Sequence, residues 1–144
     1  MVMGCASEPR DCSLAAVNED YIGSAVVDDC GNPYDDGVSG TDMTAWQAAQ
    51  TCTLDHAAHQ QPFLVRWTRQ GIEGPISGAY VGLVRDGTWM LSAFDQSAQI
   101  TGALPPTRRD SCSDLRAASS PCSSLTTNLC IDCLGRSAAD TCRP

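Results

Sequence analysis

Lysine is absent from this 144-residue sequence, and all nine basic residues are arginines. Together with 17 acidic residues they give a formal net charge of −8. Nucleic-acid-binding proteins carry a basic patch for phosphates, and this chain has no such excess of positive charge. We therefore expect no nucleic-acid partner, and acidic lipid surfaces should repel the protein.

Histidine is scarce as well, and the motifs of common enzyme classes are missing. His56 and His59 are the only two histidines, so few bases are available to activate a nucleophile. The sequence has neither a G-x-S-x-G elbow nor a glycine-rich phosphate loop. No local pattern pairs Glu73, Asp86 or Asp95 for glycoside cleavage. We therefore expect a non-catalytic protein that uses no cofactor.

Long apolar stretches are also missing, because no run is long enough to span a membrane. Cysteine, by contrast, occurs nine times, and few histidines accompany it as they would at zinc sites. In exported proteins, such cysteines are oxidised to disulfides. The sequence thus predicts an exported protein of the periplasm, the outer membrane or the extracellular space. Cytosolic redox or metal chemistry is the competing interpretation.

The best-specified part of the chain is residues 62–95, where two turn signals separate three short apolar runs. In the first run Phe63, Val65 and Trp67 point to one side, as in a half-buried strand. Asp86-Gly87 favours a two-residue type I′ hairpin, because both residues accept positive φ. This turn fixes the register of the hairpin, with the expected pairs Arg85–Thr88, Val84–Trp89, Gly82–Leu91 and Tyr80–Ala93.

Both faces of this hairpin are apolar, so we expect each of them to be covered. One face carries Tyr80, Val84, Trp89 and Leu91, and the other carries Val81, Leu83, Met90 and Phe94. Gly82 opposite Leu91 leaves room for a close neighbour or a bulge. The main interpretation is a sheet core, and the alternative is a ligand groove lined by Trp67, Tyr80 and Trp89.

The predicted fold is α+β, with one main helix on a three- or four-stranded antiparallel meander. The helix is expected over about residues 42–60, with Thr41 or Asp42 as its cap. Its apolar face should pack on the meander and consists of Met43, Trp46, Thr53, Leu54 and Ala57. Residues 21–27 are rich in apolar and β-branched residues and are interpreted as a fourth strand. The chain divides into an N-terminal tether (1–20), a core (21–104) and a cysteine-rich tail (105–144) packed on the core.

Disulfides should hold the tail in place, because it has too few large apolar residues to form its own core. Its cysteines are Cys112, Cys122, Cys130, Cys133 and Cys142. Since five is an odd number, at least one bridge must reach back, and Cys12 is the obvious partner. A Cys30–Cys52 bridge would fasten the acidic loop of residues 28–37 to the helix. Cys130 and Cys133 have the spacing of a redox pair but lack its βαβ context, so we expect structural bridges there.

No metal site is expected. His56 and His59 share a helix flank with Cys52, and side chains three positions apart can meet. Zinc would need further ligands and a second shell, and no other histidine is present. The acidic loop of residues 28–37 also lacks the ligand spacing of a calcium loop. We interpret these residues as surface histidines beside a disulfide and as a solvated loop.

The first residues, Met3-Gly4-Cys5, are similar to the end of a bacterial lipoprotein signal. In such signals a small residue precedes a cysteine that becomes lipidated. The resemblance implies a lipid anchor on Cys5, through which the protein would contact the membrane. Eight cysteines would then remain for four bridges. The alternative is a free or intermolecular thiol at Cys5.

The parts together resemble bacterial cysteine-rich exported proteins. A helix followed by a meander is also similar in architecture to cystatin-type inhibitors, although the inhibitory hairpin sequence of that family is not present. We expect a lipid-anchored, disulfide-stabilised, non-catalytic module that binds a protein or glycan of the envelope or extracellular space. The alternatives are a structural subunit of a larger extracellular assembly and a small metal- or thiol-dependent enzyme.

Overall fold

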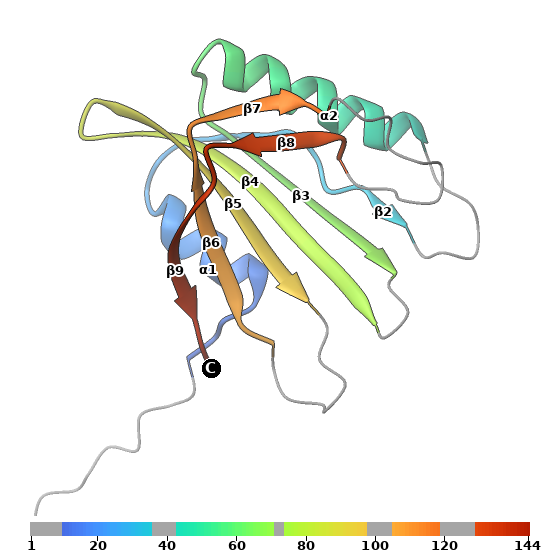
Figure 1. Ribbon diagram of the computed structural model, residues 1–144, viewed down its shortest axis with the longest axis vertical. Helices are drawn as coiled ribbons and strands as arrows, with labels where there is room; N and C mark the ends of the chain where they lie inside the picture. The colour runs from blue at the N-terminus through green and yellow to red at the C-terminus, as the bar shows by residue number, and fades with distance from the viewer. Residues whose placement is uncertain (1–9, 36–42, 71–73, 98–104, 119–128) are drawn as a thin grey trace, which may run out of the picture.

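The computed structural model describes residues 10–35, 43–70, 74–97, 105–118 and 129–144 (Figure 1). These residues form helices and strands in the order α1 (Leu14–Ile22), β1 (Asp28–Asp29), β2 (Tyr34–Asp35), α2 (Met43–Ala58), β3 (Phe63–Gln70), β4 (Pro75–Arg85), β5 (Thr88–Ser97), β6 (Thr107–Cys112), β7 (Asp114–Ala117), β8 (Ile131–Leu134) and β9 (Ser137–Cys142). The main sheet has the strand order β1-β3-β4-β5-β6-β9, and β2 also pairs with β3. β7 and β8 form a separate two-stranded sheet.

The antiparallel meander β3-β4-β5 confirms the strands expected in residues 62–95. All four predicted pairs of the β4–β5 hairpin, from Arg85–Thr88 to Tyr80–Ala93, are present. Asp86 and Gly87 have φ angles of 51° and 76°, as the two-residue turn requires. Gly82 has the predicted close neighbours, because a Cβ there would lie 2.5 Å from Phe63 and 2.6 Å from Trp89.

The sheet is larger than the predicted three or four strands. The polar tail supplies β6, which pairs with β5, and β9, which pairs with β6. The expected strand at residues 21–27 is wrong, since Tyr21 and Ile22 end a helix and the strand pairing begins at Asp28. Backbone hydrogen bonds to the neighbouring strands, rather than apolar side chains, keep β6 and β9 in the sheet. This explains why no apolar pattern in the sequence revealed them.

A second helix, α1, lies where the sequence analysis placed part of the N-terminal tether. Its cap is Ser13, whose side-chain oxygen accepts a hydrogen bond from the Ala16 amide at 3.2 Å. The helix ends at Gly23, which has a φ of 61°. The tether therefore does not extend through residues 14–20, and residues 1–9 lie outside the described part.

Helix α2 confirms the main helix predicted at residues 42–60. Trp46, Thr53 and Ala57 are buried as expected, and Ala49 joins them. Met43, in contrast, is 49% exposed at the first turn. The predicted caps Thr41 and Asp42 lie outside the described residues.

The sheet is covered on both faces, as the apolar residues on both sides of the hairpin predicted. One core joins α2 to the sheet residues Phe63 and Val65, and Leu115, Leu129 and Ile131 complete it. The other core joins α1 to the opposite face, with members Leu14, Ala79, Val81, Leu83 and Phe94. Figure 1 shows α2 and the β7–β8 pair together at one end of the main sheet.

Three disulfides join Cys12 to Cys142, Cys30 to Cys52, and Cys112 to Cys133. The Cys12–Cys142 bridge is the one expected between the tail and Cys12. The Cys30–Cys52 bridge is the one expected between the acidic loop and the helix. Cys130 is disulfide-bonded too, so all seven described cysteines are oxidised. Cys133 bonds to Cys112, so Cys130 and Cys133 do not form a redox pair with each other. Cys5 and Cys122 lie outside the described residues.

Candidate functional site

Two of the three predicted groove residues, Trp67 and Tyr80, are core residues. Their ring centroids lie 5.2 Å apart, and Trp67 is 9% exposed and Tyr80 6% exposed. The Tyr80 hydroxyl donates a hydrogen bond to the carbonyl oxygen of Ile131 at 3.3 Å. A small hollow of about 210 Å³ adjoins them, bordered by Asp95 and Leu129. Their aromatic faces are therefore used in packing.

Trp89 lies apart from this pair. It packs against Phe63, with ring centroids 6.5 Å apart, and borders a shallow depression between α2 and β7 that Leu54 and Leu115 also line. The structure brings Trp67 and Tyr80 together but does not add Trp89 to them. The three residues therefore do not line one common groove.

The burial of Tyr80 leads to a prediction for alkaline pH. Burial raises the pKa of the Tyr80 hydroxyl to about 12, whereas an unfolded tyrosine titrates near 10. Between these pH values the unfolded state loses its proton first, so the free energy of unfolding should fall by roughly 2–3 kcal/mol. Urea unfolding at about pH 9 and about pH 11.5 measures this loss.

Two phenylalanine variants test the assignment of this alkaline loss. Tyr80→Phe should remove the corresponding part of the pH dependence, while Tyr34→Phe, at a residue that is 59% exposed, should keep it. An unchanged pH dependence in Tyr80→Phe would contradict the prediction.

The two histidines have different surroundings. The His56 ring contacts the Cys30–Cys52 bridge, and its Nε2 lies 2.9 Å from Asp28 Oδ2. The hydrogen bond with Asp28 is the main reason why the pKa of His56 is raised. His59 is exposed and pairs with Asp55 one turn earlier. His56 and His59, which were only weak candidates for metal ligands, therefore do not share a common centre.

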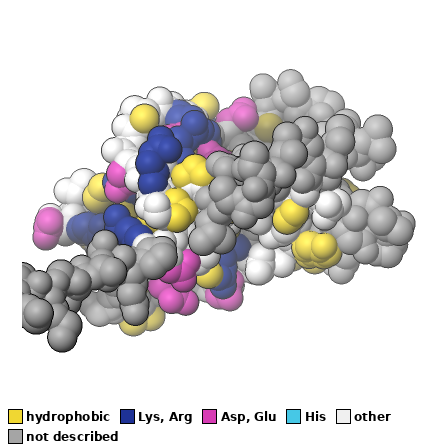
Figure 2. Space-filling view, turned by 90° about the horizontal axis from the view of Figure 1, so that it is seen from below, with side chains coloured by type: hydrophobic (Ala, Val, Ile, Leu, Met, Phe, Trp, Pro, Cys, Tyr) yellow, Lys and Arg dark blue, Asp and Glu magenta, His cyan; other side chains and the backbone are white. Residues whose placement is uncertain are grey.

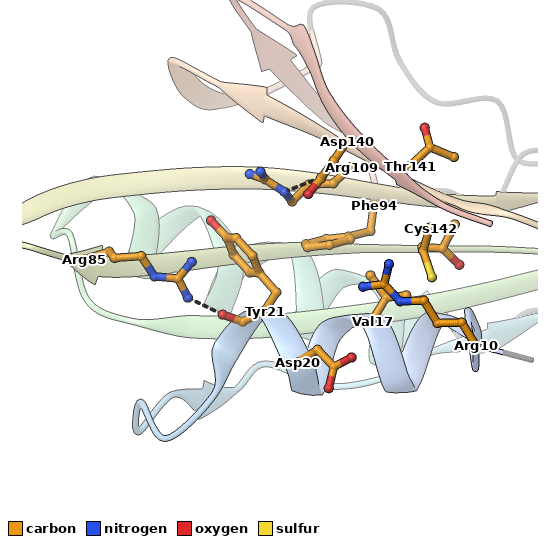
Figure 3. A pocket seen from close by; sticks show the side chains of 11 residues that line it. Arg10, Val17, Asp20, Tyr21, Arg85, Phe94, Arg109, Asp140, Thr141 and Cys142 are labelled. Atoms are coloured by element: carbon orange, nitrogen blue, oxygen red, sulfur yellow. Dashed lines mark hydrogen bonds and ion pairs between the residues drawn. The ribbon is translucent and has the colours of Figure 1, made fainter. Parts of the chain in front are cut away.

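A different site, absent from the sequence analysis, lies between α1 and the sheet (Figure 3). It is a cleft of about 320 Å³ whose walls come from α1, the end of β4, β5, β6 and β9. We call it the arginine cleft, after its lining residues Arg10, Arg85 and Arg109. Figure 3 shows Arg85 and Arg10 at opposite ends, with the Tyr21 and Phe94 rings between them.

Tyr21 is the centre of the arginine cleft, because a guanidinium lies over each side of its ring. The Cζ atoms of Arg85 and Arg109 are 4.6 and 4.8 Å from the ring centroid. Cation–π contacts at this distance are favourable, and arginine is the usual partner. The Tyr21 ring also meets Phe94 edge to face at 5.4 Å, so the aromatic layer is fixed to the core below it.

Hydrogen bonds orient both guanidiniums. Arg109 donates from Nε to Asp140 Oδ1 at 2.8 Å and from Nη1 to the Ser92 hydroxyl at 3.3 Å. Ser92 in turn donates to the Tyr21 hydroxyl at 3.0 Å. Arg85 donates from Nη2 to the carbonyl oxygen of Tyr21. The two cations are thus positioned by the fold, and Arg85 keeps further N–H donors for another group.

The charges around the cleft are not balanced in pairs. Arg109 has Asp140 as its partner, but within the described residues Arg10 and Arg85 form no ion pair. Asp20 also borders the cleft. Nearby, Arg108 and Arg136 both pair with Asp95 and with the buried Asp110. Figure 2 shows arginine side chains beside acidic and apolar ones on the surface seen from below.

This arrangement can bind an anion. Guanidinium groups suit carboxylates and phosphates because their N–H donors form a planar fork. The described lining contains no histidine, and its cysteine, Cys142, is in a disulfide. Val17 adds apolar surface, so the cleft suits an anionic group attached to an apolar body.

No sequence pattern revealed this site, because its residues are distant in the chain. Arg10, Tyr21, Arg85 and Arg109 meet only through α1, the β5–β6 register and the Cys12–Cys142 bridge. One clue was available: every positive charge in this acidic chain is an arginine.

Comparison of the chain with protein-family models, curated proteins and solved structures finds no match. Within the described residues, neither helix has the length and apolar character needed to cross a membrane. The three intramolecular disulfides are typical of exported proteins. The functional assignment therefore depends on the geometry of the arginine cleft.

Proposed function

We propose that the protein is an exported, disulfide-stabilised, non-catalytic binding module that takes an anionic group in the arginine cleft. One observation carries this proposal: two guanidiniums enclose Tyr21, and Arg85 has no acidic partner within the described residues. In a chain with a net charge of −8, a guanidinium that has no acidic partner beside an aromatic ring is a feature that would select an anion. The ligand would be a component of the cell envelope or the extracellular space, protein or glycan, with a carboxylate or phosphate.

The energetics favour a ligand with one anionic group and an apolar part. A hydrogen bond to a charged group contributes more than a neutral one, typically about 1.5–3 kcal/mol. The acidic surface of the protein disfavours polyanions, and Asp20 at the border of the cleft adds to this. Val17 offers an apolar contact next to the cations.

The location and the anchor belong to the same proposal. Three internal bridges support an oxidising compartment, and Cys5 is the proposed site of a lipid anchor. A binding module is favoured over a structural subunit with a threading tail. The reason is that β6 and β9 of the tail already pair within the protein's own sheet.

Nuclear magnetic resonance titration with hexanoate and its neutral analogue hexanamide tests the proposed binding. Hexanoate should shift amide signals of α1 and β6, hexanamide should not, and added salt should weaken the effect. Arg85→Gln should weaken hexanoate binding by about tenfold or more, which corresponds to one charged hydrogen bond.

The matched control is Arg116→Gln, which removes the same charge at an exposed residue paired with Asp114 and outside the cleft lining. It should bind hexanoate like the wild type. Equal responses to hexanoate and hexanamide, or equal weakening by both substitutions, would refute the assignment of the cleft.

A further inference from the structure

A second cluster of reactive side chains lies on the opposite face of the sheet, where α2 packs. It contains Cys30, which precedes β2, and Cys52 and His56, which are one turn apart on α2. The two sulfur atoms and His56 Nδ1 all lie within 4.8 Å of one another. The proposed function does not use this cluster, so the inference below is independent of the arginine cleft.

The position of the histidine matches that of a metal ligand. Zinc binds sulfur at about 2.3 Å and imidazole nitrogen at about 2.0–2.1 Å, so a tetrahedral site has a sulfur–nitrogen separation of roughly 3.5 Å. His56 Nδ1 lies 3.7 Å from Cys30 Sγ and 3.6 Å from Cys52 Sγ. Two of the three ligand–ligand separations are therefore already close to those of a zinc site. The third requires the bonded sulfurs to part to roughly 3.8 Å, which is possible only after reduction.

The second ring nitrogen of His56 contacts a carboxylate, as in many zinc sites. His56 Nε2 lies 2.9 Å from Asp28 Oδ2, and metal-ligating histidines commonly donate their second N–H to such a group. Backbone hydrogen bonds hold Asp28 and the neighbouring Cys30 in place. Asp28 donates its amide to Pro62, and Cys30 donates its amide to Leu64 at 2.8 Å.

The cluster is enclosed but reachable. Cys30 is 7% exposed and the His56 side chain is 15% exposed. In the described part of the chain the cluster has three ligands, which leaves a fourth position for water, the arrangement in which zinc keeps an open coordination site. His59 is not a member, because its ring bonds to the Asp55 carbonyl oxygen and side chain.

We infer that reduction of the Cys30–Cys52 bridge creates a site for one Zn²⁺, held by the two thiolates and His56 Nδ1. A dithiol reductant supplies two electrons and two protons, so the bridge becomes two thiols and the reductant becomes a disulfide. Zinc then displaces both thiol protons. His56 Nδ1, which now lies 2.8 Å from the Cys52 carbonyl oxygen, gives up this contact and any proton it carries. The bridge and the metal exclude each other, so the redox state decides which of them fastens the segment after β1 to α2.

Cobalt and zinc binding to the full-length protein test this inference. After reduction with a phosphine, which adds no competing thiol, the wild type should bind one Co²⁺ at the cluster and show thiolate-to-cobalt absorption that Zn²⁺ abolishes. The oxidised protein should show none. His56→Ala should weaken binding to the cluster by more than about tenfold. Asp28→Asn should weaken it by about tenfold, because it removes the carboxylate that bonds to His56 Nε2.

The double variant Cys112→Ser/Cys133→Ser is the matched control, because it removes another bridge and leaves the cluster intact. It should bind cobalt like the wild type, whereas Cys30→Ser/Cys52→Ser should not bind it at the cluster. The inference is overturned if reduced wild type binds no metal, or if His56→Ala binds as tightly as the wild type. It is equally overturned if the reduced chain is unfolded and zinc does not restore its far-ultraviolet circular dichroism spectrum.

Discussion

Replacing Cys12 and Cys142 by serine should lower the free energy of unfolding by about 5 kcal/mol. The bridge joins residues 130 positions apart, and loop-closure entropy gives a value of this size for such a loop. It also fastens the segment before α1 to β9, and therefore positions two walls of the arginine cleft. Guanidinium unfolding followed by circular dichroism would measure the loss.

The control for this prediction is the Cys112→Ser/Cys133→Ser double variant, whose bridge spans only 21 positions. The same relation gives about 3 kcal/mol for it, so it should be more stable than the variant without the Cys12–Cys142 bridge. The account of the long bridge would be wrong if the two variants lost the same stability, or if the order were reversed.

Phe94→Ala should cost about 3–5 kcal/mol, the usual range for a fully buried aromatic residue. Phe94 has no exposed surface and belongs to the core that joins α1 to the sheet. Its ring also supports Tyr21, so the truncation should loosen α1 and weaken hexanoate binding in the cleft. Chemical unfolding measures the stability change, and the hexanoate titration measures the second effect.

Val84→Ala on the adjacent strand is the matched control. Val84 is 53% exposed, and a substitution at such a surface position should change stability by no more than about 0.5 kcal/mol. A small effect of Phe94→Ala, comparable with that of Val84→Ala, would mean that α1 does not depend on this face of the sheet.

The parts of the fold that the sequence predicted depend on local signals. The alternation from Phe63 to Trp67 and the Asp86-Gly87 turn define three strands and their register. The alanine-rich run around Trp46 defines α2. The Cys30–Cys52 pairing followed from one cysteine before the helix and one inside it. The strand and helix signals lie within the segments they specify, and the two cysteines are 22 positions apart.

The missed elements depend on distant contacts. In α1 the polar Asn18, Glu19 and Asp20 interrupt the apolar residues, so its packing face is hard to recognise, and Asn18 is itself buried. Strands β6 and β9 are polar and have no apolar alternation. They become strands because β5 offers an edge and the Cys12–Cys142 and Cys112–Cys133 bridges hold them nearby.

The arginine cleft could not be predicted for the same reason. Its cations come from the N-terminal segment, from the end of β4 and from β6, and only the missed elements bring them to Tyr21. The predicted aromatic residues followed a local pattern, but that pattern does not distinguish a binding groove from a core. Trp67 and Tyr80 are buried under Leu129 and Ile131, which the sequence had not placed on this face.

The most direct test of the account is peptide mapping of the non-reduced protein, since its central claim is that oxidised bridges hold both chain ends on the sheet. Cleavage after arginine and before aspartate separates Cys130 from Cys133 at Asp132 and places each cysteine of the Cys12–Cys142, Cys30–Cys52 and Cys112–Cys133 bridges on its own peptide. Mass spectrometry should then find peptide 11–19 linked to 140–144, 29–34 to 42–54, and 110–113 to 132–136. Free thiols in these peptides, or a Cys130–Cys133 link, would contradict it.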